Sequence, residues 1–163
     1  MVNLTASVGR NGVNRKDDVV VVQALLNFTM GTTPGWGNIP YPNGTLCGRT
    51  IELIAKYQRR IRRKSSTMRI DARVDPFKEK SMSGQALRYS IVALNTDAFA
   101  QYLLGRRIGS SYIHTVGALY PEFKKAISGR GVGSLGLELE GGVGSLGLEL
   151  EGGGVGSLGL GLE

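Results

Sequence analysis

The chain has 163 residues, enough for one ordinary domain with a shorter attachment, and it carries a net charge of +7 with one Cys and one His. A single Cys excludes an internal disulfide, and Cys47 with His114 supplies too few ligands for a typical zinc site, so we expect no metal and no cofactor. The same shortage disfavours a Ser-His-Asp or Cys-His centre, and His114 is predicted to be an ordinary surface or packing residue.

The charge is unevenly distributed along the chain. All 20 basic residues precede residue 131, whereas five of the 13 acidic residues follow it, so residues 1–130 carry a net charge of about +12. A domain this basic favours polyanions such as nucleic acid, anionic lipid or the acidic polymers of a bacterial cell wall.

The N-terminal stretch lacks the charged start and long apolar core of a cleavable secretory signal peptide. The longest apolar run, within residues 19–26, is too short to span a membrane. We therefore expect no membrane span, and synthesis in the cytoplasm.

The first predicted helix follows Asn14, a preferred N-cap residue. Asp17 and Asp18 then place negative charge in the first turn, where it complements the helix dipole. The run of four valines would also suit a strand, but the cap, the acidic turn and the length favour a helix. Its buried face is predicted from apolar residues at helical spacing: Val19, Val22 and Leu26.

Residues 30–48 are predicted to form a loop, because five glycines and three prolines interrupt any regular pattern. Trp36 and Tyr41 lie inside this loop. Their rings either stack on a ligand or close the loop over the core, and the second reading is slightly favoured.

A second helix is predicted to start at Thr50, another good N-cap. Its apolar face comprises Ile51, Ile54, Tyr57 and Ile61. Cations near a helix C-terminus complement the dipole, but five in six positions exceed that need. They indicate either an electrostatic binding surface or a solvated face: Arg59, Arg60, Arg62, Arg63 and Lys64.

A polar connector precedes a third predicted helix, which Ser83 caps and which continues or restarts at Thr96. Gly105 and Gly109 punctuate its end, and a last short helix is predicted at Tyr120–Ile127. The fold class is therefore mainly α, a small three-helix core with extra C-terminal helices.

Residues 130–163 form a repeat tail of three near-identical units with a period of 11 to 12 residues. Leucines alternate with glycine and glutamate, a strand-like pattern, and this density of glycine opposes a helix. One unit alone cannot bury its leucine face. The tail is therefore predicted to be β-prone or flexible, pairing with itself, with other copies, or staying disordered.

Three ordered landmarks resemble those of the peptidoglycan-binding-like domain family over about residues 4–95. The first fits D-V-x-x-V-Q-x-L-L-N and comprises Asp18, Val19, Val22, Gln23, Leu25, Leu26 and Asn27. The second is G-x-x-T before a helix that ends in an aromatic-Gln pair, and comprises Gly44, Gly48, Thr50, Ile51, Ile54, Tyr57 and Gln58. The third resembles D-G-R-V-D-P, with Ala72 in place of the usual glycine, and comprises Asp71, Arg73, Val74, Asp75 and Pro76.

The resemblance implies a non-catalytic module that binds the glycan strands or stem peptides of peptidoglycan. With no signal peptide, such a module is expected to be delivered from the cytoplasm to the cell envelope or to be incorporated into a phage or secretion assembly. It divides the chain into a helical domain at 1–95, a helical extension packed on it at 96–129, and the repeat tail at 130–163. The candidate ligand contacts are aromatic rings for stacking and polar groups beside them: Trp36, Tyr41, Tyr57, Gln58, Arg59 and Arg62.

Three other functions remain open. A structural or adaptor subunit would keep the helical fold as a scaffold and oligomerise, or bind a protein partner, through residues 131–163. Nucleic-acid binding through residues 59–64 is less favoured, because no zinc-finger, RNA-recognition or helix-turn-helix signature accompanies the cations. Catalysis by a carboxylate pair, Asp71 and Asp75, is also less favoured, because Asp75 before Pro76 is more simply a turn residue.

Overall fold

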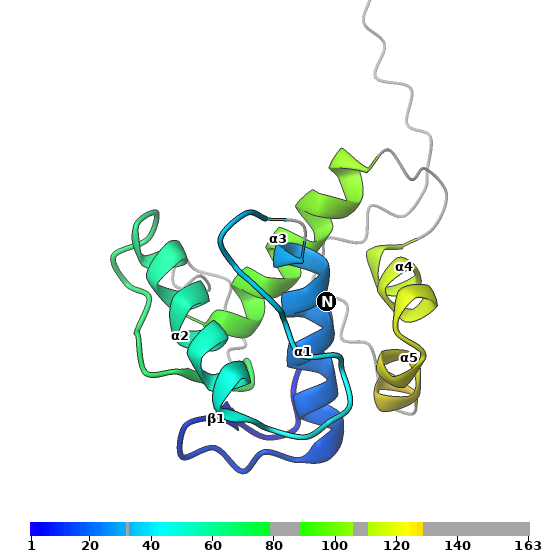
Figure 1. The fold of residues 1–163 in the computed structure, drawn as a ribbon, viewed down its shortest axis with the longest axis horizontal. Coiled ribbons are helices and arrows are strands. Elements are labelled where there is room, and N and C mark those ends of the chain that lie inside the picture. The colour runs from blue at the N-terminus through cyan, green and yellow to red at the C-terminus, as the bar shows by residue number, and fades with distance from the viewer. Residues whose placement is uncertain (32, 79–88, 106–110, 129–163) are drawn as a thin grey trace, which may run out of the picture.

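The computed structural model describes residues 1–31, 33–78, 89–105 and 111–128, and these residues form five helices and one two-stranded antiparallel ladder (Figure 1). The prediction of a mainly α fold is confirmed. Ser83, Gly109 and the repeat tail lie outside the described residues. The elements in chain order are β1 (Val8–Gly9), α1 (Lys16–Met30), α2 (Gly48–Arg62), β2 (Arg73–Val74), α3 (Ser90–Leu104), α4 (Tyr112–Leu119) and α5 (Pro121–Ile127).

Helix α1 is the centre of the fold. It is buried without a break from Asp18 to Leu26, because apolar residues occupy nearly every side of this stretch. It packs against α3 and α5, and Figure 1 shows it in the middle, with α2 on one side and α4 and α5 on the other. Each valine or leucine buried here contributes about 1.5–3 kcal/mol, so α1 is the main source of core stability.

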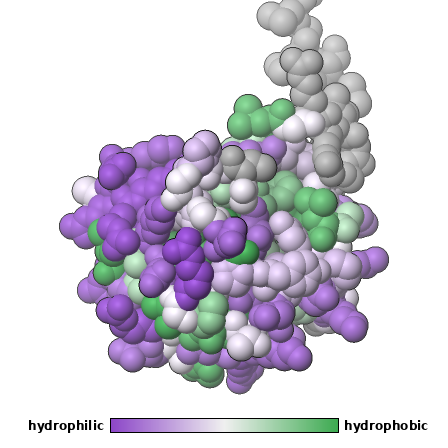
Figure 2. All heavy atoms as spheres, viewed as in Figure 1, coloured by the Kyte–Doolittle hydropathy of each residue, from purple (hydrophilic) through white to green (hydrophobic). Residues whose placement is uncertain are grey.

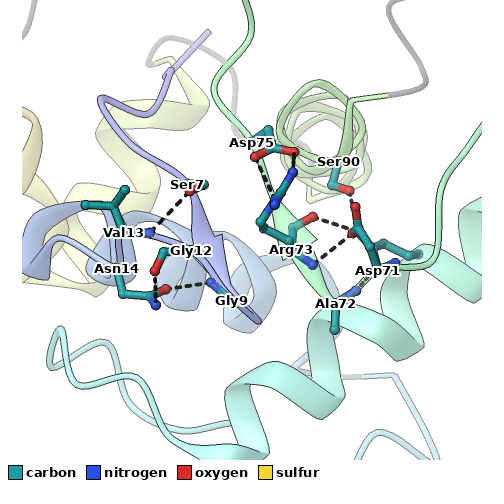
Figure 3. A network of polar contacts seen from close by, with 11 residues as sticks. Ser7, Gly9, Gly12, Val13, Asn14, Asp71, Ala72, Arg73, Asp75 and Ser90 are labelled. Atoms are coloured by element: carbon teal, nitrogen blue, oxygen red, sulfur yellow. Dashed lines mark hydrogen bonds and ion pairs between the residues drawn. The ribbon is translucent and has the colours of Figure 1, made fainter.

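The loop between β1 and α1 uses Asn14 in a way that the sequence-based prediction misses. Asn14 has φ of +56°, its Oδ1 accepts a hydrogen bond from Gly9 N at 2.7 Å, and its Nδ2 donates to Gly12 O at 2.7 Å (Figure 3). The side chain therefore stabilises the preceding loop and does not cap α1. The prediction of an Asn14 cap is wrong because the helix begins two residues later, at Lys16.

Asp18, in the first turn of α1, connects the N-terminal segment to this helix. Its carboxylate is fully buried and accepts hydrogen bonds from Thr5 N at 2.9 Å, Thr5 Oγ1 at 2.7 Å and Ala6 N at 3.0 Å. A buried carboxylate requires such partners. This first-landmark residue therefore has a structural role.

Helix α2 is amphipathic and begins at Gly48, with Cys47 as the flanking residue. Thr50 therefore lies within the first turn, and the prediction that it is the N-cap is wrong. Its buried hydroxyl accepts a hydrogen bond from Gln23 Nε2 at 3.3 Å, which connects α2 to α1. Ile51 is only half-buried, and the buried residues of α2 beyond Thr50 are Leu53, Ile54, Tyr57, Gln58 and Ile61.

Helix α3 runs without interruption from Ser90 to Leu104, so Thr96 does not restart a helix. The Thr96 hydroxyl donates to Val92 O, four residues earlier, at 3.0 Å. The expected domain limit between residues 95 and 96 falls inside this helix. Asn95 bonds to both backbone groups of Val2, at 2.8 and 2.9 Å, and to the Tyr112 hydroxyl, so it joins the N-terminal segment, α3 and α4.

Two short helices follow α3 in the described part of the chain. Helix α5 agrees with the predicted segment to within one residue, and Phe123 and Ala126 bury its inner face. Helix α4 is absent from the sequence-based prediction; the Ser111 hydroxyl caps it by accepting a hydrogen bond from His114 N at 3.3 Å. The His114 side chain is exposed.

Candidate binding groove

A groove of about 630 Å³ opens beside β2, between α2 and the start of α3. This volume is typical of a ligand site, but the lining is far more polar than in most sites for apolar ligands. Figure 3 shows how Asp71, Arg73, Asp75 and Ser90 converge here from β2, its flanking turn and α3. The lining residues are Gln58, Thr67, Arg69, Asp71, Arg73, Asp75, Tyr89 and Ser90.

Gln58 organises this groove from its floor and is only 1% exposed. Its Nε2 lies within hydrogen-bond distance of three acceptors, Asp71 Oδ1 at 2.9 Å, Arg73 O at 2.7 Å and Ser90 Oγ at 3.0 Å, which share its two N–H donors. Its Oε1 accepts from Asp71 N at 3.1 Å and Ala72 N at 2.8 Å. One amide therefore holds the turn and the start of α3 in place relative to α2.

The charged walls of the groove are held by a local ion pair. Arg73 Nε lies 2.9 Å from Asp75 Oδ1, and Arg73 Nη2 donates to Asp75 Oδ2 at 3.1 Å. The hydrogen bond to Asp75, and then the charge of that carboxylate, raise the pKa of the Arg73 guanidinium. Both side chains are more than a third exposed, so the pair contributes about 0–1 kcal/mol and a charged ligand can compete for either member.

The β1–β2 ladder fixes the opposite side of this turn. Val8 pairs with Val74, and Gly9 pairs with Arg73. Gly9 has φ of +115°, and a Cβ there would lie 2.2 Å from Ala72 O, so this contact requires glycine. Ala72 itself has φ of +58°, a conformation that glycine adopts at lower cost than alanine.

The six candidate contacts from the sequence do not share one place. Gln58 lines the groove, whereas Arg62 does not and donates to Met68 O at 3.3 Å. Arg59 is exposed on α2. Tyr57 is 1% exposed, and its hydroxyl donates to Asp97 Oδ2 at 3.0 Å. Burial, and then the charge of Asp97, raise the pKa of Tyr57 well above its usual value.

The two loop aromatics lie elsewhere and differ in exposure. Trp36 is 6% exposed, and its ring packs in the core with Lys56 Nζ 4.9 Å from the ring centroid. Tyr41 is 54% exposed, donates to Glu122 Oε2 at 2.9 Å, and meets the Tyr120 ring edge-on with centroids 6.2 Å apart. Of these two rings, Tyr41 alone presents a large exposed surface.

The candidate contacts named from the sequence omit most of the groove lining. Thr67, Arg69, Tyr89 and Ser90 carry no motif of their own and come from two separate segments. The sequence feature that could have located the groove is the third landmark, a turn rich in Asp and Arg that follows a helix ending in an aromatic-Gln pair.

In the described parts of the chain, no cluster of three or more His, Cys, Asp or Glu residues is placed to hold a metal ion. No helix there is long and apolar enough to cross a membrane. In the comparisons with known proteins, no family model, no curated protein and no solved structure matches the chain.

Proposed function

We propose that the chain is a non-catalytic module that binds bacterial peptidoglycan and holds a stem peptide in the groove beside β2. The observation that carries this proposal is the mixed charge of the groove, with Arg69 and Arg73 beside Asp71 and Asp75. Stem peptides present both carboxylates and amino groups. Arginine binds carboxylates through charge-assisted hydrogen bonds, and aspartate binds ammonium groups in the same way. A uniformly anionic ligand would be repelled by the carboxylates of Asp71 and Asp75 in this groove.

The resemblance to the peptidoglycan-binding-like family supports the same proposal, because its landmarks have connected roles in this fold. Gln23 of the first landmark holds the loop before α2, accepting from Gly44 N at 3.1 Å and donating to Thr45 O at 3.0 Å. Gln58 of the second landmark holds the third. Ala72, where the family usually has glycine, has the positive φ that glycine favours.

The roles of the two aspartates support a binding site more than a catalytic one. Asp71 Oδ1 accepts from Gln58 Nε2 at 2.9 Å and from Arg73 N at 3.0 Å, so it stabilises the turn. Asp75 forms the ion pair with Arg73. His114, the single histidine of the chain, lies on α4 and does not line the groove.

The direct test is co-sedimentation of the full chain with insoluble peptidoglycan that has been freed of attached polymers. Arg69→Glu reverses an exposed charge of the groove and should weaken binding at least about tenfold, the effect of about 1.4 kcal/mol. Lys125→Glu makes the same change in net charge on α5 and should bind like the unmodified chain. Equal binding by both variants, or equal loss, would contradict a site in the groove.

A second candidate is the structural or adaptor subunit, which one observation favours. Leu103, Leu104 and Leu119 are 57%, 76% and 48% exposed near the ends of α3 and α4, and Figure 2 shows hydrophobic surface at the end of α3. Leu103 and Leu104 adjoin each other, and adjoining exposed apolar residues are typical of a contact surface. A concentration-dependent mass that Leu104→Glu abolishes would support this function, whereas a monomer at all concentrations would contradict it.

A further inference from the structure

Five cations lie at the C-terminal end of α2, four of them are exposed, and none of the five lines the proposed groove. We call Arg59, Arg60, Arg62, Arg63 and Lys64 the basic strip. None of the ion pairs among the described residues includes a member of the strip. Arg59, Arg63 and Lys64 are exposed, and their side chains form no hydrogen bond with the described residues. Figure 2 shows mainly hydrophilic surface on the side where α2 lies.

The fold itself does not need this many cations. The helix dipole attracts positive charge in the last turn of α2, but the helix ends at Arg62, and Arg63 and Lys64 lie beyond it. Arg59 and Arg63 are four residues apart, and Arg63 at the end of α2 keeps helical backbone angles, so these two like charges repel. This repulsion offsets part of the attraction to the dipole, so folding gains little from five cations here, which points to a ligand as the reason for their charge.

We propose that the basic strip binds a phosphodiester-linked polyanion of the glycerol-phosphate type. Arginine matches phosphate oxygens with its planar fork of N–H donors, and four of the five cations are arginines. Thr67 and Arg69, which line the groove, follow the strip closely in the sequence. A polymer bound to the strip would therefore lie beside the groove.

The surroundings of the strip favour a polymer without bases. Proteins that bind single-stranded nucleic acid without sequence preference combine cations with aromatic side chains on which bases stack. Among the described residues, the exposed large aromatic side chain is Tyr41, and it contacts Tyr120 and Glu122 at α5. A polymer of alternating phosphate and small polyol units needs no such stacking surface.

The experiment measures binding of the full chain to soluble poly(glycerol phosphate) over a series of NaCl concentrations. Contacts from the four exposed cations of the strip give a slope of log K against log[salt] of about −3, since each phosphate of a single-stranded polymer contributes about −0.7. A triple variant with glutamine at Arg59, Arg63 and Lys64 should lose at least about tenfold in affinity at low salt. Its slope should become shallower by about 2.

A matched control separates the strip from net charge. Glutamine at Lys16, Lys124 and Lys125 removes the same three charges from exposed positions on α1 and α5 and should change the affinity less than about threefold. Equal losses in both triple variants, or an unchanged slope in the strip variant, would overturn the proposal. At least tenfold tighter binding of a single-stranded oligonucleotide with as many phosphates would also overturn it and assign the strip to nucleic acid.

This inference goes beyond the proposed function, and its failure is distinguishable from failure of that function. The positions substituted in the strip variant do not line the groove. Peptidoglycan freed of attached polymers should therefore sediment both triple variants as it does the unmodified chain.

Discussion

Gln58→Ala removes the amide that connects α2 to the turn at residues 71–73 and to the start of α3. It leaves the buried Ala72 N without its hydrogen-bond partner, at a cost of about 1–3 kcal/mol, whereas Ser90 Oγ keeps its hydrogen bond to Met68 Sδ at 3.5 Å. The other partners of Gln58 belong to Asp71 and Arg73, which are half-buried, so water in the groove can replace the hydrogen bonds that these two residues lose. Loss of one buried methylene adds about 0.8 kcal/mol. The free energy of unfolding should fall by about 2–4 kcal/mol.

Urea unfolding followed by fluorescence measures this loss, because Trp36 is the single tryptophan and is buried in the folded chain. Gln101→Ala is the matched control: Gln101 is half-buried on α3, and its side chain forms no hydrogen bond with the described residues. The control should change the free energy of unfolding by less than about 0.5 kcal/mol. A difference below about 1 kcal/mol between the two variants would refute the role given to Gln58.

Three further predictions follow from local geometry. Gly44→Ala should destabilise the fold by about 1–3 kcal/mol, because φ is +79° and the new Cβ would lie 2.5 Å from a Lys16 side-chain carbon; Gly48→Ala, with open space around it at the start of α2, should be neutral or stabilising in the same urea titration. Burial raises the pKa of Tyr112 from 10.0 to about 12, so the folded chain keeps a proton that the unfolded chain loses. The free energy of unfolding should therefore fall as pH rises from about 10 to about 12, and Tyr112→Phe should make that decline shallower; an unchanged slope would argue against the burial. Arg63→Gln should change the free energy of unfolding by less than about 0.5 kcal/mol, because the lost repulsion from Arg59 and the lost attraction to the dipole of α2 offset each other, while polyanion affinity falls; a loss above about 1 kcal/mol would show that the fold needs this cation.

The helices that sequence predicts best are those whose pattern is local. The apolar residues of α1 and α2 recur at helical spacing, and Pro121 marks the start of α5. The caps predicted for α1 and α2 both fail for a tertiary reason. Asn14 bonds to the preceding loop, and Thr50 bonds to a residue of α1, partners that lie outside the reach of a local preference.

Helix α4 shows the limit of local pattern more clearly. Gly117 and β-branched residues make its eight residues a poor isolated helix. Its stability comes from packing, because Tyr112 and Val116 are buried and Tyr112 bonds to Asn95 of α3. Such contacts join segments that are far apart in the sequence.

The groove was only partly predictable for the same reason. Gln58 stands in a motif that sequence reading identifies, but Arg69 and Ser90 become neighbours of Gln58 only when α2, the turn and α3 pack together. Trp36 illustrates the converse, because an aromatic ring in a polar loop resembles a ligand contact and instead packs into the core.

The central claim is that the groove beside β2 binds a stem peptide, and its most direct test is NMR titration of the isotope-labelled full chain with a soluble muropeptide. The account predicts saturable shifts concentrated at Thr67, Arg69, Asp71 and Ser90, which line the groove. No shift at millimolar muropeptide, or shifts centred on the Tyr41 region and absent from the groove, would contradict it.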